Sequence, residues 1–167
     1  MKYEVIDNFL DKEYFDHLGS IFWQTEPQRP SEIPWFFQRR VANGVKEDNI
    51  FYMIHIFYDT HEVQSNLYKH LIPLLEKLEV RGLLRIKANL YPNTEILHEH
   101  PMHIDYDFPH SGAILSLNTC DGYTKLKDGT KIDSIANRIL LFDSNEEHCS
   151  TTTTNVPARI NININYF

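Results

Sequence analysis

The segment HIDYD places a histidine and a carboxylate within reach of one metal ion. On a β-strand, residues at i and i+2 point to the same side, so the side chains of His103 and Asp105 share a face. A second histidine, His148, follows the apolar run LLFDSNEE much later in the chain. Two imidazoles and one carboxylate can hold iron(II) and leave three of its coordination positions open. The sequence therefore predicts a metal site formed by His103, Asp105 and His148.

The same His-x-Asp pattern also has a plainer interpretation. It is expected about once by chance in a chain with nine histidines and 23 acidic residues, and the pair can be a surface ion pair on a strand. Asp107 lies on the same predicted face as Asp105, although the shorter spacing to the histidine favours Asp105. We interpret His98, His100 and His110 as loop or rim histidines without a role at the metal.

An arginine lies beyond the second histidine, in the segment RINININYF at residues 159–167. Isoleucines alternate there with Arg159 and three asparagines, which predicts a strand with one apolar and one polar face. A guanidinium beside an open iron site suits a dicarboxylate cosubstrate, because its planar fork binds a carboxylate through two hydrogen bonds. The alternative for Arg159 is a solvent-facing ion pair. Asn161 lies on the same face as Arg159. It either lines the cosubstrate pocket or is an interior amide whose hydrogen bonds are satisfied within the protein.

The elements that must position these residues are mostly strands. From Gly82 onward the hydrophobic pattern has a period of two, and Asp128-Gly129 predicts a hairpin turn. Eight strands are expected, at 83–91, 102–107, 113–119, 123–127, 130–134, 138–142, 147–153 and 159–166. Such a series after N-terminal helices indicates a β-sandwich or rolled double sheet with helices on one outer face.

The N-terminal half, by contrast, is predicted to be helical or irregular. Asp11 is a candidate cap for a helix that ends near Trp23. Asp59 and Glu62 have the spacing of a capping box before a leucine stripe at 67–78, which Pro73 should kink. Residues 26–50 read as a loop with a hairpin at Asn43-Gly44. Within that loop Trp35, Phe36 and Phe37, followed by Arg39 and Arg40, form either a substrate lid or part of the core.

Composition restricts the classes of function. A net charge of −7 argues against nucleic-acid binding, because it provides no basic surface for phosphates. Two cysteines, Cys120 and Cys149, are too few for a disulfide framework, so a reducing compartment is the default. We find neither a signal peptide nor a transmembrane segment and expect a cytoplasmic protein that does not bind membranes.

Several motifs, taken in chain order, resemble those of a known family. These motifs are VIDNFLDKEYF, LLRIKANLYPN, HPMHIDYD, GAILSLNTCDGYT, NRILLFDSNEEHCST and PARININI. In this order they are similar to the iron(II)- and 2-oxoglutarate-dependent oxygenases, specifically the compact prolyl-4-hydroxylase-like members, including those carried by bacteriophages. The resemblance covers most of residues 4–22 and nearly all of 83–166. Phage origin would place the protein in the host cytoplasm.

The resemblance implies one domain, 1–167, with a mainly β fold and N-terminal helices. Residues 83–167 would form a double-stranded β-helix (jelly-roll, cupin-like) core, and 1–82 mostly helical or irregular supporting elements. It also implies that His103, Asp105 and His148 hold Fe(II). Arg159 would bind the distal carboxylate of 2-oxoglutarate with help from the Tyr91 hydroxyl, although Tyr91 can equally be an ordinary barrel aromatic.

The implied reaction uses O2 and 2-oxoglutarate to hydroxylate a substrate, with succinate and CO2 as coproducts. Related halogenases have a small residue in place of the carboxylate ligand, so Asp105 favours hydroxylation. The substrate is a small molecule or a peptide, with a prolyl residue as one candidate. Two other functions stay open: a cupin-like metal enzyme that does not use 2-oxoglutarate, and a noncatalytic jelly-roll binding module. The sequence gives no indication of oligomeric state.

Overall fold

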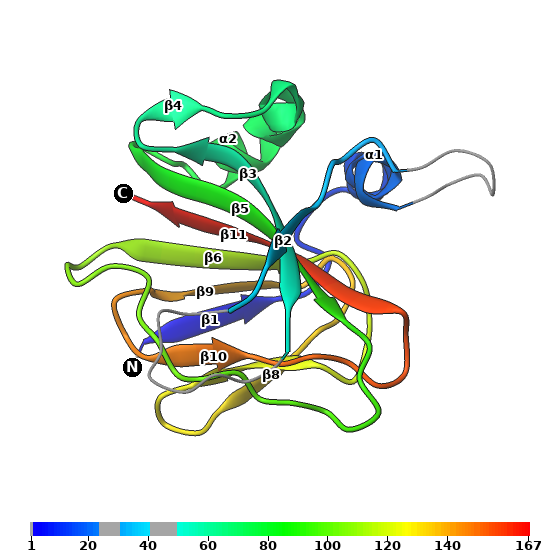
Figure 1. The fold of residues 1–167 in the computed structure, drawn as a ribbon. Helices are drawn as coiled ribbons and strands as arrows, with labels where there is room; N and C mark the ends of the chain where they lie inside the picture. The colour runs from blue at the N-terminus through cyan, green and yellow to red at the C-terminus, as the bar shows by residue number, and fades with distance from the viewer. Residues whose placement is uncertain (1, 24–30, 41–49) are drawn as a thin grey trace.

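Two antiparallel β-sheets form the body of the protein (Figure 1). The computed structural model describes residues 2–23, 31–40 and 50–167, so the predicted hairpin at Asn43-Gly44 lies outside the described residues. The large sheet has the order β1 (Tyr3–Ile6), β9 (Ile139–Asp143), β6 (Ser111–Ser116), β11 (Ala158–Tyr166), β5 (Leu83–Pro92), β3 (Tyr52–Asp59) and β2 (Phe36–Gln38), with β4 (Glu62–Val63) paired to β3. The small sheet has the order β10 (His148–Ser150), β7 (Tyr123–Leu126) and β8 (Lys131–Asp133).

The helices pack on one face of the large sheet. They are α1 (Lys12–Phe22), the 3-10 helix η1 (Asn66–Leu71) and α2 (Ile72–Lys77). Leu18 of α1 and Leu74 of α2 belong to the same buried cluster as Ile160, Ile162 and Ile164 of β11. Each of these isoleucines is at most 1% exposed, and burial of such a side chain contributes about 1.5–3 kcal/mol. The alternating isoleucines thus fix which face of β11 points toward the helices.

The small sheet covers the opposite face of the large one. Leu126 of β7 belongs to a second buried cluster with Ile114 of β6 and with Leu140 and Phe142 of β9. Two sheets packed face to face, with helices on one outer side, make a double-stranded β-helix, or jelly-roll, as predicted. The polar side chains of β5 and β11 consequently point into the space between the two sheets.

Several predicted elements are confirmed, with small differences. Seven of the eight predicted strands overlap observed strands, namely 83–91, 113–119, 123–127, 130–134, 138–142, 147–153 and 159–166. Gly129 has a φ of 90° in the turn between β7 and β8, a conformation that favours glycine. The first helix begins directly after Asp11, but the Asp11 side chain makes no capping hydrogen bond. The leucine stripe is divided into η1 and α2, with Pro73 in the first turn of α2.

Other predictions are wrong. Asp59 and Glu62 do not start a helix but face each other across β3 and β4, joined by Thr60 and His61 with φ angles of 50° and 63°. β3 pairs with β5 inside the large sheet, so residues 1–82 are not simply helical or irregular support. The predicted strand at 102–107 is also absent: His103 makes only an isolated bridge to His148. None of the described helices is long and apolar enough to cross a membrane.

Candidate metal centre

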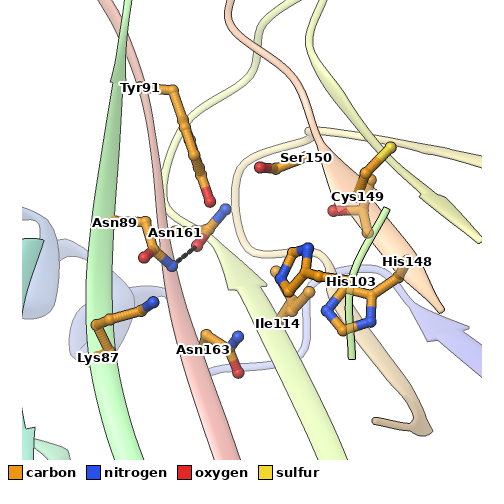
Figure 2. A pocket seen from close by; sticks show the side chains of 11 residues that line it. Lys87, Asn89, Tyr91, His103, Ile114, His148, Cys149, Ser150, Asn161 and Asn163 are labelled. Atoms are coloured by element: carbon orange, nitrogen blue, oxygen red, sulfur yellow. Dashed lines mark hydrogen bonds between the residues drawn. The ribbon is translucent and has the colours of Figure 1, made fainter. Parts of the chain in front are cut away.

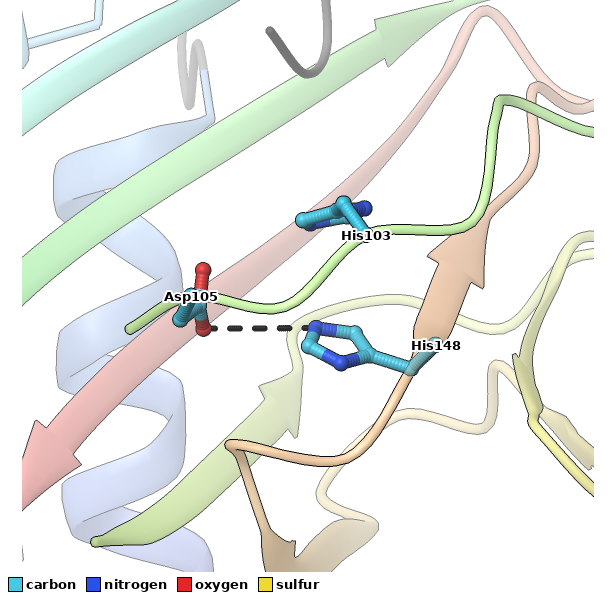
Figure 3. A group of neighbouring side chains, drawn as sticks. All are labelled: His103, Asp105 and His148. Atoms are coloured by element: carbon cyan, nitrogen blue, oxygen red, sulfur yellow. Dashed lines mark ion pairs between the residues drawn. The ribbon is translucent and has the colours of Figure 1, made fainter. Parts of the chain in front are cut away.

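The three predicted ligands meet between the sheets. One ligand atom from each of His103, Asp105 and His148 lies within 4.8 Å of the other two (Figure 3). His148 is the first residue of β10, whereas the other two lie in the coil segment before β6. Reciprocal backbone hydrogen bonds of 2.9 Å between His103 and His148 join the coil to the strand. This bridge sets the imidazoles side by side, with ring centroids 4.6 Å apart.

Both imidazoles are oriented through their Nδ1 atoms. His103 Nδ1 lies 3.3 Å from the carbonyl oxygen of Pro101, and His148 Nδ1 lies 3.0 Å from that of Glu146. The Nε2 lone pair is then available to a cation, the usual arrangement for metal-binding histidines. Burial lowers the pKa of His103 to about 4 and also lowers the pKa of His148. Both rings are therefore neutral near pH 7, as a metal ligand must be.

The Asp105 carboxylate is held by four donors. Its Oδ1 accepts from the Arg85 guanidinium at 2.7 Å. Its Oδ2 accepts from Ser144 Oγ at 2.9 Å, Asn165 Nδ2 at 2.9 Å and Asn163 Nδ2 at 3.2 Å. Burial raises the pKa of Asp105, but Arg85 and the other donors outweigh burial and lower it far below its ordinary value. A permanently ionised carboxylate beside two neutral imidazoles fits a divalent cation of the iron(II) type.

Arg159 is buried beside the pocket. It is 1% exposed, and the described residues provide no carboxylate partner for it. Its NH2 donates to Thr124 Oγ1 at 2.9 Å and its NH1 to the Thr151 carbonyl at 3.3 Å, while Nε has no partner among the described residues. Because a buried charge normally requires a counter-charge, this guanidinium fits an anionic ligand group.

Tyr91 is placed next to this arginine by strand pairing. It lies directly opposite Arg159 in the β5–β11 register, and the guanidinium lies 5.4 Å from the centre of its ring. Burial raises the pKa of Tyr91, and Arg159 opposes this rise. The tyrosine ring also stacks on Tyr52 at 5.7 Å between centroids. The hydroxyl is thus uncharged near pH 7 and able to donate to a carboxylate.

A small pocket lies between these groups (Figure 2). Its lining residues come from β5, β6, β7, β10, β11 and the 103 segment: Lys87, Asn89, Tyr91, His103, Ile114, Thr124, His148, Cys149, Ser150, Asn161 and Asn163. Asn161 is one of these lining residues and accepts a hydrogen bond of 2.9 Å from Asn89 Nδ2. Arg159 lies behind this lining, in contact with Thr124 and Tyr91.

Four cross-strand pairs organise one wall of the site. The register of β5 and β11 sets Tyr91 opposite Arg159, Asn89 opposite Asn161, Lys87 opposite Asn163, and Arg85 opposite Asn165. We call these pairs the polar ladder. Sequence reasoning did not single out Arg85, Lys87, Asn163 and Asn165 as site residues, because alternation alone does not tell which polar face lies over a pocket. The alternation of polar residues on two adjacent strands was the signal that could have found them.

The remaining candidates lie outside the metal centre. Asp107 is exposed, while Asp105 is the carboxylate that meets the histidines. His100 and His110 are buried rather than on a rim: His100 packs on the Tyr91 ring and His110 lies 3.2 Å from the Asn165 amide. The Cys149 sulfur points away from the two histidines in Figure 2.

The aromatic triplet at 35–37 is divided between core and surface. Trp35 packs against Phe22 of α1, whereas Phe36 and Phe37 are 57% and 62% exposed. The core interpretation therefore holds for Trp35 alone. The lid interpretation stays a prediction for the two phenylalanines.

Comparison with known proteins supports the fold. No protein-family model and no curated protein matches the chain by sequence. A 2OG-Fe(II) oxygenase family oxidoreductase from Burkholderia pseudomallei has a TM-score of 0.70 at 10% identity, over 98% of this chain and 84% of that one. A Pseudomonas putida prolyl-4-hydroxylase has a TM-score of 0.62 at 16% identity, over 98% and 91%.

A third similar structure is a Trichoplax adhaerens prolyl hydroxylase in complex with a peptide fragment of the hypoxia inducible factor oxygen degradation domain. Its TM-score is 0.60 at 18% identity, over 99% of this chain and 83% of that one. At these identities the likeness concerns the fold. This chain therefore shares the jelly-roll fold seen in prolyl hydroxylases and 2OG-Fe(II) oxygenases.

Proposed function

We propose that this protein is an iron(II)- and 2-oxoglutarate-dependent dioxygenase that hydroxylates its substrate. The observation that carries the proposal is that two neutral imidazoles and one ionised carboxylate meet beside a pocket. Behind the pocket wall lies a buried arginine for which the described residues provide no carboxylate partner. His103, Asp105 and His148 would hold the iron. Arg159 would take the distal carboxylate of 2-oxoglutarate, with Tyr91 donating from the same rung of the polar ladder.

The iron with 2-oxoglutarate and O2 supplies an oxidant that inserts one oxygen atom into a C–H bond, while the cosubstrate becomes succinate and CO2. The residues of the chain bind and orient the reactants. Arg85, Asn163 and Asn165 keep the Asp105 carboxylate ionised and fixed in direction. The pocket between the sheets limits access of water.

The retained carboxylate ligand supports hydroxylation rather than halogenation, because Asp105 leaves no room for a halide. Two of the similar structures are prolyl hydroxylases, and one of these holds a peptide. A prolyl residue is therefore a reasonable first substrate to test.

The proposal is tested by anaerobic binding measurements. We expect wild-type protein to bind Fe(II) and then 2-oxoglutarate. A charge-transfer absorption band should form when 2-oxoglutarate is added to the Fe(II)-loaded protein. His148→Ala should lose the metal and the band. Arg159→Met should retain the metal but bind 2-oxoglutarate at least about tenfold more weakly. His17→Ala, an exposed histidine on α1, is the matched control.

Two results would contradict the proposal and indicate the alternatives. Metal binding without any response to 2-oxoglutarate would indicate a metal enzyme of another type. Absence of metal binding in wild-type protein would indicate a noncatalytic module. With O2 admitted, formation of succinate that depends on both His148 and Arg159 completes the test.

A further inference from the structure

Lys87 introduces a positive charge into the pocket that the metal centre does not use. It lies on β5, and Figure 2 shows its amino group pointing into the pocket from the wall opposite the two histidines. It is the one charged residue among the described residues that line the pocket, and none of those residues is acidic. A lysine in the lining of the pocket is notable because the chain as a whole has a charge of −7.

The ammonium of Lys87 has no counter-charge in contact. Within residues 2–23, 31–40 and 50–167 the structure shows neither an ion pair nor a hydrogen bond for it, and its close contact is the Tyr52 ring, 5.7 Å from Nζ. Asp105 and Asp59 act on Lys87 only through space, and Asp105 is already paired with Arg85. Burial lowers the pKa of Lys87 to about 8, with Arg85 adding to the effect, so the ammonium is still mostly charged near pH 7.

The oxygens of two neighbouring amides also lack partners among the described residues. The Oδ1 atoms of Asn89 and Asn163 are buried and make no hydrogen bond with the described residues. Asn163 lies directly opposite Lys87 in the polar ladder, and Asn89 is the next residue on the same face of β5. Buried polar groups are normally satisfied, so these two oxygens would accept from hydrogen-bond donors on the ligand, whereas an anionic group would be bound by the Lys87 ammonium.

The cosubstrate does not account for Lys87. This step rests on the proposed function, in which 2-oxoglutarate places one carboxylate at Arg159 and the other at the metal. We propose that Lys87 binds a carboxylate of the primary substrate, so that the substrate is a small carboxylic acid rather than an uncharged residue within a peptide chain. An ion pair formed away from water would place the acid beside the metal and exclude neutral analogues.

The experiment uses acetate and acetamide as probes of equal size and different charge. Protein is loaded with Mn(II) and 2-oxoglutarate without O2, and the paramagnetic relaxation of each probe is measured by NMR as a function of its concentration. We expect wild-type protein to bind acetate about tenfold more tightly than acetamide. Lys87→Gln should lose this difference and Lys87→Arg should retain it. Lys127→Gln, at an exposed lysine, is the matched control.

Each contrary result overturns the inference in a recognisable way. If Lys87→Gln still prefers acetate, the preference has another source. If wild-type protein shows no preference, the site does not select carboxylates. If Lys87→Gln binds Mn(II) but no longer binds 2-oxoglutarate, Lys87 serves the cosubstrate. A capped, neutral prolyl peptide that drives 2-oxoglutarate turnover equally in wild type and Lys87→Gln would also contradict the inference.

Failure of the proposed function can be distinguished from failure of this inference. If the proposed function is wrong, wild-type protein binds Mn(II) but not 2-oxoglutarate. The two probes, measured on the Mn(II)-loaded protein alone, then still decide whether Lys87 selects a carboxylate.

Discussion

At the scale of single residues, the buried Asp105 carboxylate is the most constrained group in the site. Four donors, from the two strands β5 and β11 and from the turn at Ser144, converge on its two oxygens. A carboxylate fixed in this way keeps its charge and direction whether or not a cation is bound. Groups that contact a metal ligand in this way commonly change metal affinity by 10–100-fold when they are removed, an order-of-magnitude range from other proteins.

Removal of the Arg85 side chain tests this constraint. Arg85→Met should weaken Mn(II) binding by about 10–100-fold, because Asp105 loses its charged donor and its orientation. The measurement is titration of Mn(II), with free metal followed by electron paramagnetic resonance. Arg81→Met, at an exposed arginine just before β5, is the control and should bind as wild type. Unchanged affinity in Arg85→Met would mean that the three neutral donors suffice to hold Asp105.

Residue patterns predicted the cluster of His103, Asp105 and His148 better than its surroundings. These three residues and Arg159 were singled out because they follow one another in a recognisable order, and the structure brings the first three together. Lys87 was missed because a lysine on an alternating strand usually faces solvent. Which polar face is covered by a second sheet depends on tertiary packing, which the local pattern does not encode.

At the scale of elements, the register of β5 and β11 positions most of the site. A shift of one residue would move every side chain of the polar ladder to the helix side and every isoleucine into the pocket. The buried isoleucine cluster therefore specifies the register that the chemistry requires. Packing on one face of the sheet and polar function on the other depend on the same strand pairing.

Gly122, just before β7, offers a test of how closely the second sheet supports the ladder. A Cβ at this position would lie 2.6 Å from the Thr152 carbonyl oxygen and 2.7 Å from Cδ of Arg159. Gly122→Ala must therefore displace the arginine. We expect 2-oxoglutarate binding to weaken about tenfold or more while Mn(II) binding stays near wild type. Both affinities can be measured by calorimetry without O2.

Gly19→Ala in α1 is the control for this substitution. A Cβ there meets no atom within 4 Å, and alanine is the better helix former, so stability should rise by about 0.5–1 kcal/mol with both affinities unchanged. Loss of metal binding in Gly122→Ala would show that the substitution unfolds the second sheet rather than moving Arg159.

Elements with strict alternation and clear turn residues were predictable, whereas elements held by long-range contacts were not. β11 alternates isoleucine with polar residues throughout and was found almost to the residue. β3 was missed because Asp59 and Glu62 also match a helix cap, and only pairing with β5 decides between the two. The coil that carries His103 is paired only by isolated bridges in the described structure, Glu99 with Thr151 and His103 with His148, so its extended shape comes from tertiary structure.

At the scale of the whole molecule, the site joins the two sheets and should couple ligand binding to folding. His148 and Thr124 belong to the small sheet, while Arg159 and Tyr91 belong to the large one. A metal and a cosubstrate bound between them would hold the sheets together. Groups that bind only the folded state stabilise it by mass action.

This coupling predicts a change in thermal stability. Mn(II) with 2-oxoglutarate at about 100 times its dissociation constant should add ~2.7 kcal/mol to the free energy of unfolding. For a chain of 167 residues this corresponds to a rise in Tm of roughly 5–10 °C. Differential scanning calorimetry measures the effect, which His148→Ala should abolish. An equal rise in that variant would place the stabilising ligands at some other position.

The central place of β11 also affects how the protein can be made. β5 and β6 leave the ribosome well before β11, yet each forms hydrogen bonds with β11 along one of its edges. Until residues 158–166 have been synthesised, those two edges remain open to other chains. Contacts between segments so far apart in sequence form slowly. Nascent chains of this protein therefore pass through a period of exposure to aggregation, in which protection by chaperones has the most effect.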